Sequence, residues 1–397
     1  MEDAVIVDAV RTPMGKRNGS LSGWHPADLA AEVLKALAER NNLDPSTVDD
    51  VIMGCVMQVG AQAVNVGRSA VLTAGWPETV PSTTIDRQCG SSQQSAHFAA
   101  QGVMAGAYDI VIAAGVEVMS LVPMGATVLD TTMGEPFTVA MNERYAADGG
   151  LVPQGIGAEM ISDRWGLTRE DLDAFALQSQ QRAARARDEG RYDNEIIPVA
   201  EKILDRENGK VIVTGQTVRT DGGIRESTIE SLAGLKPAFV PEGRVTAGNS
   251  SQITDGAAAV LIMSASKAKE LGLKPRARFH SFAVAGVDPV TMLTGPIPAT
   301  TKVLDKAGLT IDDIDVFEVN EAFASVVLAW EKEHHPDMER VNPNGGAIAL
   351  GHPLGCSGAR LMATMLNELE RTEGRYGLQT MCEGGGMANA TIIERLD

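Results

Sequence analysis

The sequence predicts an α/β protein in which two similar halves surround a long insertion. Short runs of apolar, β-branched residues alternate with segments of helical periodicity, as in AVIVDAV (4–10) followed by DLAAEVLKALAER (28–40). This alternation is typical of βαβ units in a mostly parallel sheet that is covered on both faces. The second half repeats the layout of the first, whereas residues 121–249 follow neither pattern.

The first half continues with two further apolar runs, DDVIMGCVMQ at 49–58 and YDIVIAAGVEVM at 108–119. Between them lies a segment centred on Cys89. The run AAAVLIM at 257–263 is the longest apolar stretch, and it is too short to cross a membrane. We therefore interpret it as a buried strand.

The second half carries two segments that match the first. AGLTIDDIDVFEVNEAFA at 307–324 has the layout of NNLDPSTVDDVIMGCVMQ at 41–58, with a turn, paired aspartates and then an apolar strand. Gly-rich turns also open small-residue helices at 89–106 and at 351–370. These matches indicate an internal duplication of an α/β unit of about 120 residues.

The insertion is irregular apart from one amphipathic helix. Thr168 is the predicted N-cap of this helix, together with Asp171 three residues later. One face of the helix carries Leu172, Phe175, Ala176 and Ser179. A long, loop-rich insertion in a compact α/β protein is usually a lid or a binding element. The predicted domains are 1–120 together with 250–275, the loop domain 121–249, and 276–397.

The composition argues against several classes of protein. A formal net charge of −18 without any Lys- or Arg-rich run argues against nucleic-acid binding, so an anionic ligand needs a local basic or amide-lined patch. The start MEDAVIVDAV lacks the features of a signal peptide. The four cysteines, none in a CxxC pair, argue against a disulfide framework and a zinc site; they are Cys55, Cys89, Cys356 and Cys382. We expect a cytoplasmic protein with no metal.

Cys89 stands between the polar residues DRQ and the small residues GSS. VPSTTI before it is typical of a strand end, and the residues after it have helical spacing, which places Cys89 at a strand-to-helix turn. The N–H groups of a helix N-terminus favour a thiolate, so we expect a lowered pKa for Cys89. A buried structural cysteine is the alternative.

Three further segments carry groups that could act with this thiol. GHPLGCSGAR (351–360) brings His352 to the start of a helix, either as a base or as a packed side chain. CEGGGMANA (382–390) offers glycine N–H groups for an oxyanion, or forms a flexible turn. NEAFA (320–324) ends an apolar strand with Asn320, for which a helix cap is the alternative.

Taken together, these segments resemble the thiolase family. DRQCGSS, NEAFA, GHPLGCSGAR and CEGGG span almost the whole chain, and RVTAGNSSQITDGAAAVL at 244–261 resembles the family signature between the inserted and second domains. The resemblance implies a thiolase-like fold, with two duplicated βαβαβ-type halves in a five-layered α/β arrangement and an inserted loop domain. It also implies CoA-dependent thiolysis of a 3-ketoacyl-CoA to acetyl-CoA and a shortened acyl-CoA, or the reverse condensation.

The resemblance assigns roles to individual residues. Cys89 is the nucleophile, His352 is its base, and Cys382 is the acid and base at the α-carbon of acetyl-CoA. Asn320 holds a water that stabilises one oxyanion with His352, and the N–H groups of Cys89 and Gly384 stabilise the other. Cleaving a carbon–carbon bond next to a ketone needs such a soft nucleophile, a site for enolate charge and a proton donor.

The resemblance also identifies CoA as a co-substrate rather than a resident cofactor. The residues that it assigns to CoA contacts are Arg225, Ser251, Ala322 and Phe323. Without the resemblance, Arg225 is an ordinary surface arginine.

Several rival functions stay open at this point. Ketoacyl synthases and hydroxymethylglutaryl-CoA synthases share the fold but lack the second cysteine before three glycines. A catalytically silent, lipid-binding relative should have lost Cys89, His352 or Cys382, and all three are present. A short-chain acetyl-CoA acetyltransferase, which forms acetoacetyl-CoA, is the alternative thiolase.

The acyl group is predicted from the loop before the long inserted helix. Short-chain thiolases usually carry His-Met-Gly there, whereas this chain has Pro153 and Gln154 before Gly155. The ending CEGGGMANATIIERL resembles thiolases of sterol and branched-acid degradation. We therefore expect β-oxidation of medium-chain or ring-bearing acyl groups and, by resemblance, a homodimer or a homotetramer built through the insertion.

Overall fold

The computed structural model describes residues 2–130, 132 and 134–397, and its first half is built on a five-stranded sheet. The elements of this half are β1 (Ala4–Arg11), α1 (Pro26–Arg40), β3 (Asp50–Gly54), α2 (Val66–Thr73), β4 (Ser82–Ile85), α3 (Ser91–Met104), β5 (Ile110–Val118) and β8 (Thr254–Ser264). Their strands lie in the order β4-β3-β5-β8-β1. A short strand, β2 (Gly15–Lys16), pairs with β8, and α8 (Ala265–Glu270) follows β8.

The second half has the same strand order. Its elements are β9 (Ala277–Gly286), α9 (Pro296–Ala307), β10 (Val316–Val319), α10 (Ala324–His334), α11 (Ala347–Leu350), α12 (Ser357–Thr372), β11 (Tyr376–Glu383) and β12 (Met387–Arg395). Val341 forms a parallel bridge with Phe317 of β10, in the position that β4 has beside β3. The Val341 bridge can be counted as a strand, and the five strands of each half can be numbered along the chain. Across the sheet, both halves then have the strand order third, second, fourth, fifth, first, and the strand directions match. The internal duplication is confirmed.

Both sheets are mixed, so the prediction of a mostly parallel sheet is wrong. β8 runs antiparallel to β1 and β5, and β12 runs antiparallel to β9 and β11. The physical reason is clearest for β12, which follows β11 after the three glycines 384–386. So short a connection can join only antiparallel neighbours, because a parallel strand needs a long crossover.

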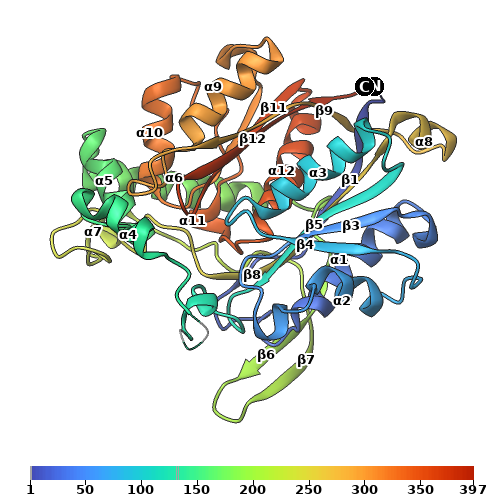
Figure 1. Cartoon of the computed structure of the whole chain (residues 1–397), viewed down its shortest axis with the longest axis horizontal. Coiled ribbons are helices and arrows are strands. Elements are labelled where there is room, and N and C mark those ends of the chain that lie inside the picture. The colour runs from blue at the N-terminus through green and yellow to red at the C-terminus, as the bar shows by residue number, and fades with distance from the viewer. Residues whose placement is uncertain (1, 131, 133) are drawn as a thin grey trace.

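Helices and sheets alternate in five layers (Figure 1). α1 and α2 cover the outer face of the first sheet, α9 covers the outer face of the second, and α3 and α12 pack against each other between the two sheets. The central helices approach closely, since a Cβ atom at Gly358 would lie 2.2 Å from the backbone nitrogen of Gln93. β1 and β9 join the sheets edge to edge through Val5 and Arg278. This close packing explains the small residues of the central helices.

The insertion contributes α4 (Val139–Tyr145), α5 (Gln154–Arg164), α6 (Arg169–Asp188), β6 (Val199–Asp205), β7 (Lys210–Val218) and α7 (Ile229–Ala233). The reciprocal hydrogen bonds of Thr168 and Asp171 confirm the predicted capping box of α6. The predicted apolar face of α6 is buried, and the helix packs against α7, α10 and α11. The hairpin of β6 and β7 projects from the body of the molecule (Figure 1).

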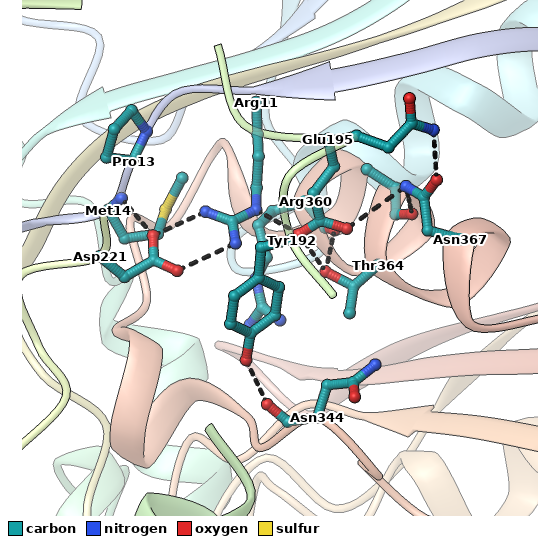
Figure 2. Close-up of polar contacts among 12 residues, drawn as sticks. Arg11, Pro13, Met14, Tyr192, Glu195, Asp221, Asn344, Arg360, Thr364 and Asn367 are labelled. Atoms are coloured by element: carbon teal, nitrogen blue, oxygen red, sulfur yellow. Dashed lines mark hydrogen bonds and ion pairs between the residues drawn. The ribbon is translucent and has the colours of Figure 1, made fainter. Parts of the chain in front are cut away.

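A buried charge cluster fastens the insertion to both halves (Figure 2). The Arg11 side chain, at the end of β1, donates from Nε to Glu195 and from both terminal nitrogens to Asp221, at distances of 2.6–2.9 Å. Thr364 of α12 donates to Glu195 over 3.0 Å. The Arg11, Glu195 and Asp221 side chains have no exposed surface. One guanidinium therefore holds together β1 and two distant parts of the insertion.

Membrane-spanning helices and metal-binding clusters were sought among the described residues. Within them, no helix is both long and apolar enough to span a membrane. The same part of the chain contains no group of three or more His, Cys, Asp and Glu side chains arranged to hold a metal ion. The four cysteines are free thiols, and all four are buried.

Candidate active site

Cys89 lies in the tight turn between β4 and α3, as the sequence predicts. Gln88 has a φ of 48°, a left-handed conformation that few residues with a side chain adopt. Ser91 stabilises the turn, because its hydroxyl accepts the Arg87 N–H at 2.9 Å and donates to the Gln88 carbonyl at 2.6 Å. The Cys89 side chain is therefore held in one position at the N-terminus of a buried helix.

The pKa of Cys89 is raised to about 12, so the expectation of a lowered pKa is wrong. Burial is the main cause and the Glu383 carboxyl is the second, while the backbone N–H groups of Cys89 and Gly384 act in the opposite direction. The helix N-terminus does favour the thiolate, but loss of solvation outweighs it. The free protein therefore holds Cys89 as a thiol, which needs a base before it can attack.

His352 is the residue that the sequence predicts as this base, and it is buried. It lies between α11 and α12, where its Nδ1 atom is 2.5 Å from the Ser357 hydroxyl, and that hydroxyl donates to the Pro353 carbonyl at 2.8 Å. Because the single hydroxyl proton is used in this way, Nδ1 of His352 must carry a hydrogen and Nε2 is left as an acceptor. Burial, followed by the charge of Arg360, lowers the pKa of His352 to about 3. The imidazole is thus neutral and its Nε2 carries no proton.

Asn320 faces this histidine rather than capping a helix. Its side-chain nitrogen lies 3.4 Å from Nε2 of His352. The following helix, α10, has Phe323 at its N-cap position and no side-chain cap hydrogen bond. The Asn320 amide oxygen is buried and has no partner among the described residues. The helix-cap interpretation is therefore wrong.

Cys382 lies at the end of β11, directly before Glu383 and Gly384. Its pKa is raised well above the ordinary value, by burial first and then by Cys89 and Glu383. The residue after Cys382 lies against the Cys89 turn, because a Cβ atom at Gly90 would lie 2.1 Å from Oε1 of Glu383. The Cys89 charge also raises the pKa of Cys382, and the Gly384 N–H lowers that of Cys89. The fold therefore gathers residues about 300 positions apart in the chain.

A cleft of about 250 Å³ leads to this cluster. Among its walls are four of the predicted residues, namely His352, Ser251, Ala322 and Phe323. Met119 and Leu354 line the cleft and also belong to the apolar cluster that surrounds Cys89, so the cleft and the thiol share walls. The backbone N–H of Ser251 donates to the Ala322 carbonyl at 2.9 Å, which joins the two sides of the cleft.

Arg225 does not line the cleft. It is exposed, and its backbone N–H donates to the Gln180 side chain at 3.0 Å. Gln252, which does line the cleft, donates to the Gly223 carbonyl at 3.0 Å. Arg225 is thus two residues after Gly223, whose carbonyl is hydrogen-bonded to the cleft wall, and it lies on the outer side of the site.

Three further residues near the site were not indicated by the sequence patterns. Ser357 orients His352, and its only sequence signal is its place in the GHPLGCSGAR segment. Glu117, inside the apolar strand β5, accepts the N–H groups of Val56, Met57 and Gly355, and so fixes the His352 loop to the first half. Glu383, the residue after Cys382, is fully buried. An acidic residue within an apolar strand is the signal that could have found both glutamates.

Comparisons with known proteins agree with this geometry. The chain matches the family models for "Thiolase, N-terminal domain" over residues 4–266 and "Thiolase, C-terminal domain" over residues 273–395. It is 52% identical to the steroid 3-ketoacyl-CoA thiolase FadA6 of Mycobacterium tuberculosis, over 100% of this chain and 95% of the relative. It is 47% identical to the 3-ketoacyl-CoA thiolase of Aliivibrio salmonicida, over the full length of both.

A solved structure supports the same conclusion. The crystal structure of the Bacillus anthracis acetyl-CoA acetyltransferase superposes with a TM-score of 0.88 at 39% identity, covering 100% of this chain and 99% of that one. Both halves, the insertion and the candidate active site lie within the matched region. The chain belongs to the thiolase family.

Proposed function

We propose that the protein catalyses CoA-dependent thiolysis of 3-ketoacyl-CoA to acetyl-CoA and a shortened acyl-CoA, with CoA as co-substrate. The observation that carries this proposal is that the cleft lined by a neutral His352 with an unprotonated Nε2 shares its walls Met119 and Leu354 with the apolar cluster around the buried, neutral Cys89 thiol. Neither group is charged at rest, so the thiolate forms only when a proton moves between them. Such paired activation is the logic of nucleophilic catalysis.

The first half-reaction transfers the acyl group to Cys89. The Cys89 proton passes to Nε2 of His352, and the thiolate attacks the 3-keto carbon. The bond between C2 and C3 then breaks, and the electron pair leaves on acetyl-CoA as an enolate, which takes a proton from Cys382. A water on Asn320, together with His352, and the N–H groups of Cys89 and Gly384 are the proposed oxyanion sites.

The second half-reaction restores the enzyme. The CoA thiol gives its proton to the Cys382 thiolate, and the CoA sulfur attacks the acyl group on Cys89. The Cys89 thiolate leaves and regains its proton from His352. Each group thus returns to its starting charge, which fits a buried site where a lasting charge is costly.

The proposed CoA contacts are Arg225, Ser251, Ala322 and Phe323. Three of them line the cleft, and the Phe323 ring packs edge to face against Phe239 at 6.0 Å, which forms an apolar wall for the pantetheine arm. Arg225 lies outside the cleft and is exposed, a place suited to a phosphate of CoA. Because the net charge is −18, such local contacts must hold the anion.

The acyl group is proposed to be medium-chain or ring-bearing. Gln154 lines the cleft together with Ala322 and Phe323, and it is the first residue of helix α5 rather than part of the expected loop; short-chain relatives usually carry a methionine in this segment. Methionines 57, 119 and 381 surround Cys89, and such side chains adapt to irregular ligands. FadA6, at 52% identity, is named as a steroid thiolase, which supports the same substrate class.

Short-chain acetyl transfer is the second candidate, because the superposed B. anthracis structure is named as an acetyl-CoA acetyltransferase. Specificity constants for thiolysis across 3-ketoacyl-CoAs decide between the two. Longer or ring-bearing substrates should be preferred. A preference of about tenfold or more for acetoacetyl-CoA, roughly 1.4 kcal/mol in the transition state, selects the short-chain function instead. No thiolysis of any substrate would leave a silent lipid-binding protein.

The proposal extends to the assembly, the location and the domain limits of the protein. A homodimer or homotetramer built through the insertion is supported by exposed apolar side chains there, namely Leu121, Met124, Val128, Leu129, Phe137 and Val139. Light scattering should give at least twice the chain mass of 41.9 kDa. The free thiols support a cytoplasmic location. The division into 1–120 with 250–275, 121–249 and 276–397 is supported by the return of β8 to the first sheet.

A further inference from the structure

Glu383 is a buried carboxyl group to which the proposed reaction gives no role. It lies between Cys382 and Gly384 at the end of β11, and it has no exposed surface. Neither of its carboxyl oxygens has a hydrogen-bond partner among the described residues. A buried ionised carboxylate without donors is costly, so this placement favours the protonated acid.

The carboxyl group lies against the turn that holds the nucleophile. A Cβ atom at Gly90 would lie 2.1 Å from Oε1 of Glu383 and 2.7 Å from the Asn389 side-chain nitrogen. That Asn389 nitrogen also donates to the Gly90 carbonyl at 3.0 Å. Gly90 follows Cys89 directly, so Glu383 and Asn389 together cover one side of the Cys89 turn. Only a glycine at position 90 leaves room for this contact.

Four titratable or charged groups face Glu383 from the elements packed around it. Arg87 and Asp86 precede Cys89 in the chain. The charge of Arg87 lowers the pKa of Glu383, and the charge of Asp86 raises it. Burial is the dominant cause, and it raises the pKa of Glu383 to about 8. The other two groups are Cys89 and Cys382, whose own pKa values the Glu383 charge raises. One carboxyl therefore acts on both sulfurs.

We propose that Glu383 is a positioning residue that controls the charge available to the two cysteines. When Glu383 is protonated, its uncharged carboxyl group packs against the turn at Gly90. Once ionised it opposes thiolate formation at both Cys89 and Cys382. The inference rests on the roles proposed above for these cysteines, and it explains why an acid is tolerated beside two groups that must each become negative during one turnover.

The consequence is an alkaline limit on acylation. As Glu383 ionises, transfer of the Cys89 proton to His352 places a second negative charge beside the first. A pair of like charges in a buried site is strongly disfavoured. Acylation of Cys89 should therefore become harder as the pH rises through the range in which Glu383 loses its proton, and a neutral isostere should remove this limit.

The test measures alkylation of each cysteine by iodoacetamide, which needs no acyl-CoA. Rates are followed from about pH 6 to about pH 10, and peptide mapping by mass spectrometry separates Cys89 and Cys382. Glu383→Gln keeps the shape of the side chain but cannot ionise. Above about pH 8, where Glu383 of the wild type is ionised, Cys89 of this variant should be alkylated about tenfold faster, which corresponds to a tenfold higher ratio of thiolate to thiol. Equal or slower alkylation of Cys89 in Glu383→Gln at this alkaline pH overturns the proposal.

Matched controls separate this effect from a structural one. Glu331→Gln removes a partly buried carboxyl of α10, and it should leave the Cys89 profile unchanged. Glu383→Asp keeps an ionisable group and should retain more of the wild-type pH dependence than the glutamine variant. If neither Glu383 variant changes the rate of Cys89 alkylation relative to the wild type, the proposed role of Glu383 is wrong, even if thiolysis itself is confirmed.

A second measurement uses the wild-type protein and does not depend on folding of a variant. Infrared spectra should show a protonated carboxyl band that disappears between about pH 7 and about pH 9. If no carboxyl group titrates in that range, the proposal is wrong. The proposed function itself is judged separately, by thiolysis of 3-ketoacyl-CoA.

Discussion

The Nδ1 atom of His352 lies 2.5 Å from the Ser357 hydroxyl oxygen, which in turn donates to the Pro353 carbonyl at 2.8 Å. This chain fixes the tautomer of the imidazole and leaves Nε2 as the proton acceptor. Helix α12 positions the hydroxyl, because Ser357 is its first residue. The first residue of α12, in the second half, therefore orients the imidazole. The Cys89 thiol precedes α3 in the first half.

Replacing Ser357 with alanine should slow acyl-enzyme formation. Without an acceptor for Nδ1–H the ring can rotate or change tautomer, and misplacement of a catalytic group costs about 10²-fold in rate. Rapid-quench measurement of the acyl-enzyme checks this, with kcat reduced and KM little changed. Ser325→Ala is the matched control, because that buried hydroxyl has no hydrogen-bond partner within the part of the chain that the structure describes. Equal effects of both variants would remove Ser357 from the mechanism.

The two cysteines should have separable roles. Cys89→Ala should abolish covalent acetyl-enzyme formation from acetyl-CoA, because no other thiol lies in the turn after β4. Cys382→Ser should still form the acetyl-enzyme but should lose carbon–carbon bond cleavage, since a serine hydroxyl is a much weaker acid than a thiol. Intact-mass spectrometry and a thiolysis assay report the two steps. Thiolysis near the wild-type rate in Cys382→Ser would contradict the assignment.

Arg225→Ala should raise the KM for CoA and change kcat less. This pattern is expected when a contact binds substrate and transition state equally. Arg219→Ala is the control, since Arg219 is an exposed arginine of the same segment. If steady-state kinetics show an unchanged KM for CoA in Arg225→Ala, Arg225 is not a CoA contact.

Arg11→Met should lower the free energy of unfolding by about 3–5 kcal/mol, because it leaves the buried Glu195 and Asp221 without their partner. Urea unfolding followed by circular dichroism measures the change. Arg187→Met, which removes a solvent-exposed pair with Asp188, should leave the unfolding midpoint in place. A small effect of Arg11→Met would show that the insertion is held by other contacts.

Stability should fall as the pH rises toward 8, in part because of Glu383. Its pKa is raised from the ordinary value of 4.5 to about 8, so between these values the folded protein binds a proton that the unfolded chain has lost. Stability decreases with pH wherever the folded state binds more protons. Urea midpoints measured from about pH 5 to about pH 8.5 should therefore decline less steeply in Glu383→Gln than in wild type. Parallel declines would contradict the raised pKa.

Local sequence signals determined the elements and much of the site. The capping box of α6, the strand-to-helix turn at Cys89 and the buried strand at 257–263 were all predictable, because each depends on residues close together in the chain. The duplicated layout could also be read directly, since both halves repeat the same order of turns and apolar runs. The motifs then indicated the family, and with it the candidate catalytic residues.

Tertiary structure alone decided the electrostatics and the direction of the strands. The pKa of Cys89 is raised rather than lowered, because burial and Glu383, 294 residues away in the numbering, outweigh the local helix N-terminus. Asn320 faces His352 instead of capping a helix, and Arg225 lies outside the cleft. Burial and long-range contacts depend on how distant segments pack, which no local pattern in a single sequence records.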